Sequence, residues 1–459
     1  MSCCVADSTP STISRMLPRS PPSPDPRLMR RAVQGWPYEF LPVMEEIVAR
    51  HGDVVRIAFG VPVRYVCSHP DAVKQVLVDE RDNFVKAGPD NEVIRSIIGT
   101  GLLTSDGPRW KRLRTSAIPQ FRPAQLQLYS EVVAEECEAL ADRWEKRART
   151  GDSIDVCPEM LRFAISVLGR ALFGVDLGHH LHELVGAFRT INSEASRDPT
   201  VPVLPFLWGQ GRARYRAALR TIDRICAEIA DESAGSSGTL LAALCDGPVN
   251  ASTARDHVKN FLFAGHATTA SVLSFLTYVL GSEADVARRA AAEVDTVLGA
   301  RPVRFDDLKE LDELRRICQE TLRCYSPVWH MPYQSRRATV IGGYRIPARA
   351  IVSISPYLMH RRADLWPDPL RFDPDRFLRE RVRERSPYMY IPFGMGARRC
   401  IGERLSTIEI TMMLAVLSRR FVVELLDDEP VRCMPILTFR PDDRLRVRVR
   451  QRSTADGRT

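Results

Sequence analysis

Residues 393–402 read Phe-Gly-Met-Gly-Ala-Arg-Arg-Cys-Ile-Gly, and a helix-like stretch from Ile401 to Leu417 follows the cysteine, Cys400. The helix dipole and the free backbone N–H groups at a helix start favour negative charge. They lower the pKa of a thiol placed there, and a thiolate is a good metal ligand. Gly394 and Gly396 let the backbone turn tightly and approach a ligand closely. The pattern therefore favours a metal-binding Cys400 over a buried cysteine at a glycine-rich turn.

A thiolate-ligated haem iron is the chemistry that this layout serves best, because the sulfur donates electron density that favours O–O cleavage. The ten residues fit Phe-x-x-Gly-x-Arg-x-Cys-x-Gly and closely resemble the haem-binding signature of the cytochrome P450 family. The resemblance implies haem b with Cys400 as the axial iron ligand. It also implies haem contacts from Phe393, Gly394, Arg398 and Gly402.

Residues 260–269 read Asn-Phe-Leu-Phe-Ala-Gly-His-Ala-Thr-Thr, within a long helix expected from about Ala254 to Leu280. Small side chains let such a helix pass close to a flat cofactor, and threonine hydroxyls can bond back to i−4 carbonyls. The stretch resembles the family's Ala-Gly-x-acid-Thr-Thr motif. This resemblance implies catalytic roles for Ala264, Gly265 and Thr268, with Thr268 assisting dioxygen and passing protons. A helix-packing face of small residues is the alternative.

One position departs from that motif, because Ala267 stands where the family has a carboxylate on the proton path from solvent. His266 is adjacent, and a histidine titrates near neutrality. Neighbours on a helix point about 100° apart, however. Replacement of the acid by His266 is therefore a hypothesis beside two others, water and a substrate hydroxyl.

The pair Glu320 and Arg323 places a carboxylate and a guanidinium three residues apart on one helical face. Such a pair is usually a surface contact, but it resembles the family's Glu-x-x-Arg pair. In the family this pair joins an arginine of a later Pro-x-Arg-Phe segment, supplied here by Arg376 in residues 374–377. The implied role of the three is a buried structural lock that holds the haem loop.

Trp110 and Arg114 lie four residues apart and resemble the family's Trp-x-x-x-Arg segment. An indole N–H and a planar guanidinium are suited to a carboxylate such as a haem propionate. Arg398 is the third expected propionate partner. A surface basic helix is the alternative for the first two.

The family's further propionate arginine is absent, since counting back nine positions from Gly342 gives Tyr333. His330 and Arg336 are the candidates to replace it, and the sequence does not choose between them.

Pocket residues follow from the resemblance, and core packing is the alternative for each. They are Phe261, Phe263, Val328, Trp329, Leu437 and Thr438. Together with an apolar loop at 200–208, they imply a lipophilic substrate with one or two polar anchors.

Helices are also expected at 70–77, 123–173 with a break near 151, 181–195, 209–233 and 311–324, with strands at 54–67, 340–353, 421–425 and 445–450. The fold class is thus mainly α (α+β), and the resemblance implies a helical prism with a small β-rich lobe. We expect one haem-thiolate catalytic domain over 37–450, a disordered lead-in at 1–36 and a disordered tail at 451–459.

The chain has 459 residues, a net charge of +8 and eleven scattered cysteines without a C-x-x-C pair. The cysteines fit a reducing cytosol and argue against structural zinc. No nucleic-acid motif or transmembrane anchor is recognised, so a cytoplasmic monomer is expected. The basic excess fits docking of an acidic protein, and Arg361, Arg362, Arg398 and Arg399 are candidates for that face.

The resemblance implies a monooxygenase that inserts one oxygen atom of dioxygen, by hydroxylation or epoxidation, into a lipophilic small molecule. A terpenoid, a polyketide and a fatty acid all fit as substrates. A ferredoxin and a ferredoxin reductase are the expected electron donors. Two alternatives remain at this point. One is a haem-thiolate enzyme that uses peroxide or performs desaturation or rearrangement, and the other is a non-catalytic haem protein that recruits partners or senses gas.

Overall fold

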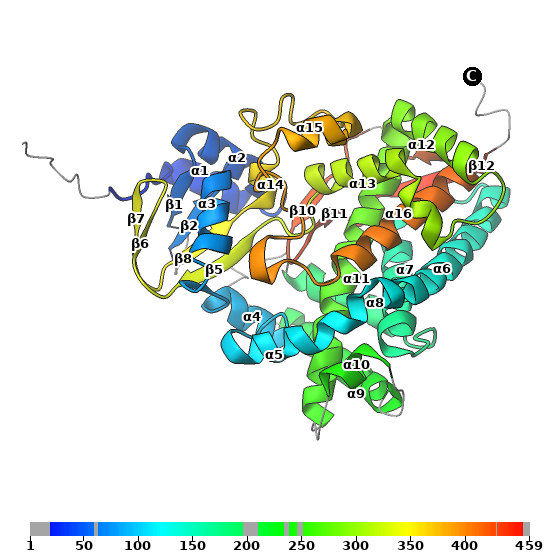
Figure 1. Cartoon of the computed structure of the whole chain (residues 1–459), viewed down its shortest axis with the longest axis horizontal. Helices are drawn as coiled ribbons and strands as arrows, with labels where there is room; N and C mark the ends of the chain where they lie inside the picture. Colours follow the sequence, from blue (N-terminus) through cyan, green and yellow to red (C-terminus); the bar gives the residue numbers. More distant parts are fainter. Residues whose placement is uncertain are drawn as a thin grey trace, which may run out of the picture.

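The structure is a computed structural model, and it describes residues 19–58, 63–195, 210–233, 238–245, 251–427 and 429–452. Helices dominate these residues, and Figure 1 shows the long helices on one side and a small group of strands on the other.

The α-helices are α1 (Pro26–Gln34), α2 (Phe40–His51), α3 (Pro70–Lys74), α4 (Pro89–Ile98), α5 (Gly107–Ala117), α6 (Pro123–Thr150), α7 (Val156–Leu168), α8 (Leu181–Ala195), α9 (Gln210–Ser233), α10 (Leu240–Leu244), α11 (Ala251–Ser282), α12 (Ala284–Val297), α13 (Asp312–Cys324), α14 (Pro356–Met359), α15 (Arg379–Arg383) and α16 (Glu403–Arg420). Short π- and 3-10 segments are η1 (Gln75–Asp79), η2 (Ile118–Phe121), η3 (Gly169–Phe173), η4 (Phe305–Lys309), η5 (Pro374–Phe377) and η6 (Gly396–Arg398). The strands are β1 (Val54–Ile57), β2 (Arg64–Cys67), β3 (Phe84–Val85), β4 (Ile154–Asp155), β5 (Met331–Ser335), β6 (Thr339–Ile341), β7 (Tyr344–Ile346), β8 (Ile351–Ile354), β9 (Phe421–Leu425), β10 (Cys433–Pro435), β11 (Phe439–Pro441) and β12 (Arg446–Gln451).

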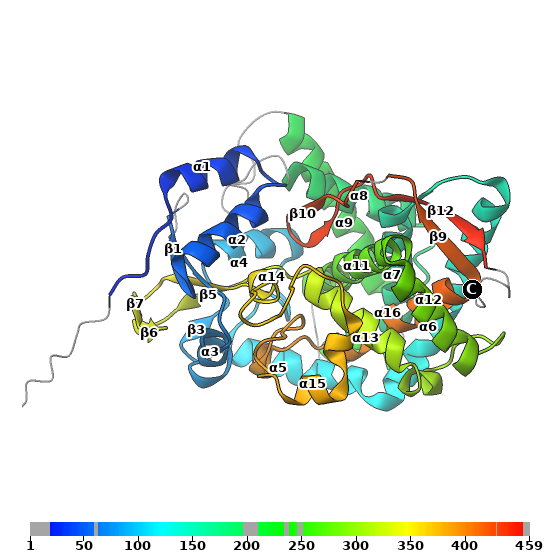
Figure 2. The ribbon, with the colours of Figure 1, turned by 90° about the horizontal axis from the view of Figure 1, so that it is seen from above.

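The long helix α11 runs through the middle of the molecule, where it packs on α7, α9 and α16. Figure 2, the view from above, also shows α11 near the middle of the molecule, beside α7. Its apolar side chains are buried on more than one side, as Leu262, Leu273 and Phe275 illustrate. By length and composition it is the one helix among the described residues that could cross a membrane, but most of it is buried inside the protein. A helix that is apolar all round in this way is a core helix.

The largest sheet has five strands in the order β1-β2-β8-β5-β3. The pair β2–β8 is parallel and the other pairs are antiparallel. In this register Tyr333 of β5 lies opposite Val352 of β8, so the sheet carries Tyr333 into its interior, where it is buried. A second sheet, β4-β12-β9, closes the far end of the helical part.

Most expected elements are present close to their predicted bounds, including α8, α9, α13 and β9. The expected lead-in differs, because residues 26–34 form helix α1. Asp25 caps its start by accepting a hydrogen bond of 2.7 Å from the backbone N–H of Arg27. The helix buries Leu28 and Met29 in a hydrophobic cluster shared with α2, so this part of the lead-in has a packed apolar face. The apolar loop predicted at 200–208 lies outside the described residues.

Candidate active site

The Cys400 loop is a tight turn that ends at the first residue of α16. The backbone N–H of Cys400 donates a hydrogen bond of 2.8 Å to the carbonyl of Phe393. Gly394 and Gly396 have φ of 71° and 69°, a region that disfavours other L residues. A Cβ on Gly396 would lie 2.3 Å from the carbonyl oxygen of Leu77, so no larger residue fits there without movement. The glycines therefore set the path of the loop.

The Cys400 side chain is exposed, although α16 is largely buried after its first turns. Desolvation raises the pKa of its thiol, and the backbone N–H of Gly402 opposes that rise. The lowered thiol pKa expected from the helix start is thus outweighed. Coordination to a metal ion deprotonates a thiol outright, so a thiolate at Cys400 depends on its metal partner.

The expected propionate partners come together beside the start of α5. The Arg398 guanidinium lies 4.5 Å from the centroid of the Trp110 ring. It also donates to Asp106 Oδ1 at 2.5 Å and to the carbonyl of Ser105 at 3.0 Å. Arg114 is half-buried, and its positive charge is close enough to Cys400 to lower the pKa of that thiol. Within the described ranges, neither its guanidinium nor the Trp110 indole N–H has a hydrogen-bond partner.

Lys86 is a third cation in this cluster, and no sequence motif indicates it. Its Nζ lies 4.3 Å from the centroid of the Tyr333 ring, in front of the position where the family's arginine is missing. Desolvation lowers its pKa to about 8, with a smaller lowering from the nearby charge of Arg398. A lysine held in this way gains from a carboxylate close by.

The two candidates that the sequence offered for this position have different places. The Nδ1 atom of His330 lies 3.2 Å from Ser353 Oγ, and desolvation lowers the pKa of its ring to about 4. A neutral imidazole at pH 7 offers a hydrogen bond but no positive charge. Arg336 is exposed and follows Ser335, the last residue of β5, whereas Tyr333 is buried within the strand. Lys86 is therefore the cation that stands at the Tyr333 position.

These observations fit a haem between α11 and the Cys400 loop. Cys400 offers a soft sulfur ligand, and Arg114, Arg398 and Lys86 provide positive charge for two carboxylates. Ala264 is exposed in the middle of a helix whose neighbouring residues are mostly buried, so open space also reaches α11. An unpartnered guanidinium and indole N–H beside an exposed thiol are the donor set that a dicarboxylate iron macrocycle requires.

Thr268 and Ala264 lie on one face of α11, and the Thr268 hydroxyl donates a hydrogen bond of 2.8 Å to the Ala264 carbonyl. Gly265 does not share this face. A Cβ there would lie 2.8 Å from a methyl carbon of Leu168 on α7. Gly265 is thus small where two helices meet, as the packing alternative expects, and its catalytic role stays a prediction.

His266 points away from the Cys400 side of α11. Its ring stacks on Phe188 of α8 with centroids 3.7 Å apart, and its Nδ1 lies 2.7 Å from the carbonyl of Leu262. Desolvation lowers the pKa of this buried imidazole to about 4. His266 therefore stays neutral and enclosed at neutral pH, which contradicts the hypothesis that it replaces the missing acid.

A buried carboxyl group, Glu409, lies on the other side of α11 from His266, and no sequence motif indicates it. The Thr269 hydroxyl donates a hydrogen bond of 3.1 Å to Oε2 of Glu409 on α16. Glu409 is 3% exposed, and desolvation raises its pKa to about 8. Glu409 therefore holds its proton at neutral pH, and its hydrogen-bond partner Thr269 is the residue next to Thr268 on α11.

Glu320, Arg323 and Arg376 form one buried ionic group. Arg323 donates to both oxygens of Glu320, from Nε at 2.7 Å and from Nη2 at 2.8 Å. Arg376 Nε lies 3.3 Å from Oε1 of the same carboxylate. Arg323 also donates to the carbonyl of His360 at 2.7 Å, so the group joins α13 to the loop that leads towards Cys400. Neither Glu320 nor Arg323 is exposed.

The expected pocket residues divide into two sets. Phe261 is buried and stacks on Phe121 of η2 with centroids 6.5 Å apart, and Phe263 packs against the same core. These two follow the core-packing alternative. The others gather where two loops meet, since Trp329 Nε1 donates to the carbonyl of Ile436 at 3.1 Å. This places Val328, which is exposed, beside Leu437 and Thr438.

The four arginines expected to dock an acidic protein mostly have partners within the chain. Arg362 pairs with Asp53 at 2.5 Å and with Asp364 at 2.6 Å. Arg361 donates to the carbonyl of Cys324 at 2.7 Å. Arg398 is held by Asp106, and Arg399 pairs with Glu403. These arginines therefore stabilise the loops that carry them, and their part in docking an acidic protein stays a prediction.

Comparisons with known proteins agree with this site. The family model for cytochrome P450 matches residues 21–442. The chain is 35% identical over 404 residues to cyclooctatin synthase of Streptomyces melanosporofaciens, covering 85% of this chain and 87% of that protein. It is 31% identical over 420 residues to pentalenene oxygenase of Streptomyces avermitilis, covering 88% and 92%.

Among solved structures, the haem domain of a cytochrome P450DA triple mutant has the same fold, with a TM-score of 0.84 at 24% identity. The match covers 95% of this chain and 99% of that domain. The fold is therefore the mainly helical P450 fold with small sheets, and the cofactor is haem with a cysteine thiolate on its iron. The chain belongs to the cytochrome P450 family, and it is a haem-thiolate monooxygenase.

Proposed function

We propose that this monooxygenase hydroxylates or epoxidises a terpenoid of bacterial secondary metabolism. The observation that carries the proposal is the 30–35% identity, over most of the chain, to three Streptomyces oxygenases named for terpenoid substrates or products. These names include a hydrocarbon, pentalenene, and an alcohol, cyclooctat-9-en-7-ol. A polyketide or a fatty acid is less well supported.

The residues of the site support a lipophilic substrate. We assign the substrate wall to Val328, Trp329, Leu437 and Thr438, which combine apolar surface with one hydroxyl. Phe261 and Phe263 support the wall from the core. A mostly apolar wall of this kind suits a compact hydrocarbon with few polar groups.

When bound, haem supplies the activation of dioxygen, and Cys400 is the residue assigned to its iron. We assign Trp110, Arg114, Arg398 and Lys86 to the propionates, with the loop residues Phe393, Gly394 and Gly402 against the macrocycle. His330 offers a neutral hydrogen bond to the same edge. Together these residues orient the cofactor and balance its negative charge.

Proton delivery is assigned to α11 and α16. Thr268 holds its hydroxyl on the same helix face as Ala264, and Glu409 holds a proton behind Thr269. The family's acid is absent at Ala267, whereas Glu409 is a buried acid that burial keeps protonated at neutral pH. We propose that it is the internal proton reservoir for the site.

We propose that a ferredoxin and its reductase supply the electrons. We also propose that the protein is a monomer in the cytoplasm. The exposed basic side chains of α5 support this docking, since Lys111 and Arg112 have no hydrogen-bond or ion-pair partner among the described residues. They lie on the same helix as Trp110 and Arg114. An acidic ferredoxin would thus meet α5 close to the haem edge.

The test is a reconstitution with a bacterial ferredoxin and reductase and a panel of cyclic terpene hydrocarbons and alcohols. The proposal predicts a product that gains one oxygen atom from isotope-labelled dioxygen. Oxygenation of fatty acids or polyketides only would contradict the substrate class. Ala267 favours one alternative, a peroxide-driven enzyme, and product formed with peroxide but not with reduced ferredoxin would identify it.

A further inference from the structure

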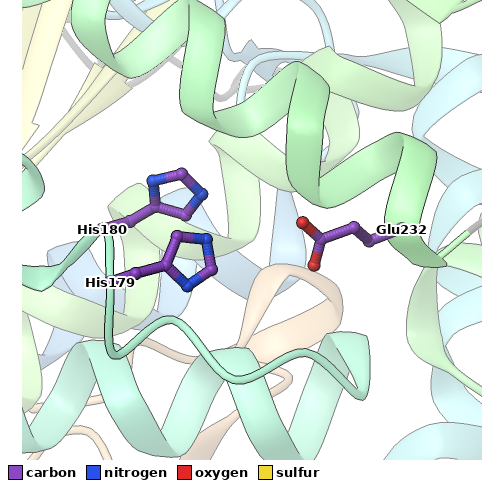
Figure 3. Close-up of side chains that lie close together, drawn as sticks. All are labelled: His179, His180 and Glu232. Carbon is purple, nitrogen blue, oxygen red and sulfur yellow. The ribbon is translucent and has the colours of Figure 1, made fainter.

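Three side chains that bind metals in proteins lie together outside the haem site, where the loop before α8 meets the last turn of α9. His179 and His180 belong to the loop, and Glu232 belongs to α9. One ligand atom from each lies within 4.8 Å of the others. Figure 3 shows the two imidazole rings one above the other, each with a nitrogen turned towards the Glu232 carboxylate.

We propose that His179, His180 and Glu232 bind one Zn²⁺ ion. Two imidazoles and a carboxylate are a ligand set that zinc takes, with a water in the fourth position. Because Zn–N bonds are about 2.0–2.1 Å long, ligand atoms around a tetrahedral ion lie about 3.4 Å apart. His179 and Glu232 are exposed, so rotation of their side chains can close the remaining distance.

The backbone that carries these ligands is fixed on both sides. His180 is 7% exposed, and its carbonyl accepts the hydrogen bond of 2.9 Å that begins α8, from the N–H of Leu184. Ser233, next to Glu232, donates a buried hydrogen bond of 2.9 Å to the carbonyl of Phe173 in η3. The end of α9 is thus tied to the segment that leads into the histidine loop. A ligand set held in this way loses little freedom when an ion binds.

The charges around the group also favour a cation. Glu228 lies one turn before Glu232 on α9, and its Oε2 is 3.3 Å from His180 Nε2. Arg224 holds this carboxylate with a hydrogen bond of 2.9 Å. The last turn of α9 contains no basic side chain, so nothing on that turn neutralises the negative end of the helix dipole. Within the described residues, Glu232 itself has no hydrogen bond or ion pair.

A metal ion here would join the start of α8 to the end of α9, two helices that pack against each other. The ion would therefore be a structural clamp on this helix pair and not a part of the oxygenation chemistry.

The test is a calorimetric titration of the haem-loaded, chelator-treated protein with zinc chloride, followed by dialysis and elemental analysis. We expect the wild type to bind one zinc ion per chain more than the double variant His179→Ala/Glu232→Gln does. Each single variant, His179→Ala and Glu232→Gln, should weaken zinc binding roughly tenfold or more. The matched control is His182→Ala, an exposed histidine in the first turn of α8 outside the group.

Both substituted side chains are exposed, so the variants should fold and keep their haem content. Zinc should raise the unfolding temperature of the wild type and of His182→Ala, and should not raise that of the double variant. Equal zinc affinity in the wild type and the double variant would overturn the proposal, as would the absence of saturable binding in the wild type.

Discussion

The Thr269 hydroxyl donates a hydrogen bond of 3.1 Å to Glu409 Oε2, which joins the helix beside the oxygen site to the helix that follows Cys400. Burial keeps this carboxyl protonated at neutral pH, because it raises the pKa of Glu409 to about 8. The chain lacks the family's acid at Ala267, and this contact places another proton donor, Glu409 of α16, against the residue that follows Thr268 on α11. The first two predictions rest on it.

Glu409→Gln removes the proton reservoir but keeps the shape and the hydrogen bond to Thr269. We expect the amount of product per electron consumed to fall at neutral pH, by at most the roughly 10²–10⁴-fold that a proton-transfer group contributes. Unproductive release of peroxide should rise at the same time. The measurement compares product and peroxide with the reductant used. His266→Phe is the matched control, since the ring of His266 is enclosed by α8. Equal coupling in wild type and Glu409→Gln would assign the proton path elsewhere.

The same carboxyl group predicts a pH dependence of stability. Its folded pKa is raised to about 8 from a usual 4.5, so the folded state binds a proton that the unfolded state releases. This contribution is fully present below about pH 4.5 and is lost as the pH rises towards 8. Unfolding by denaturant at several pH values should show a smaller fall over that window in Glu409→Gln. A parallel fall in both proteins would contradict the raised pKa.

The buried group of Glu320, Arg323 and Arg376 predicts a large cost for losing one partner. Glu320→Ala leaves two guanidinium groups without their carboxylate, which costs about 3–5 kcal/mol of unfolding free energy. We expect loss of haem incorporation, measured as the ratio of Soret to protein absorbance. Glu380→Ala, on exposed α15, is the control. Normal haem content in Glu320→Ala would rule out the lock.

Lys86 predicts a change in haem binding that no sequence motif indicates. Lys86→Met keeps the length of the side chain over Tyr333 but removes its charge. We expect haem to be lost faster to an acceptor such as apomyoglobin, because one propionate partner is gone. Lys74→Met, whose lysine pairs with Asp79 at 2.8 Å on the surface, should behave as the wild type. An unchanged rate of haem loss in Lys86→Met would mean that Lys86 does not bind a propionate.

The exposed basic side chains of α5 predict a charge effect on electron transfer. Lys111→Glu should slow reduction by ferredoxin, and the difference from the wild type should shrink as salt screens the charges. Stopped-flow reduction at two ionic strengths measures this. Lys309→Glu, on η4, reverses a charge on another part of the chain as the control. A salt-independent rate in the wild type would mean that docking does not use this face.

The sequence predicts those parts of the fold and of the site that depend on short, local patterns of residues. The turn around Cys400 needs glycine at 394 and 396, and α8 and α9 show the helical period, so both are readable along the chain. The Lys86–Tyr333 and Thr269–Glu409 pairs are not, since each joins residues more than a hundred positions apart. The directions in which Gly265 and His266 face are not readable for a related reason: a motif gives the residues of a helix, while packing on α7 and α8 decides which way they face.

The thiolate ligation of haem by Cys400 is the central claim, and the difference spectrum of the dithionite-reduced protein with carbon monoxide tests it most directly. We expect a Soret band at the long wavelength that gives the cytochrome P450 family its name, and loss of that band in Cys400→Ser. A band at the shorter wavelength of histidine- or thiol-ligated haem, in freshly prepared folded wild type, would contradict it.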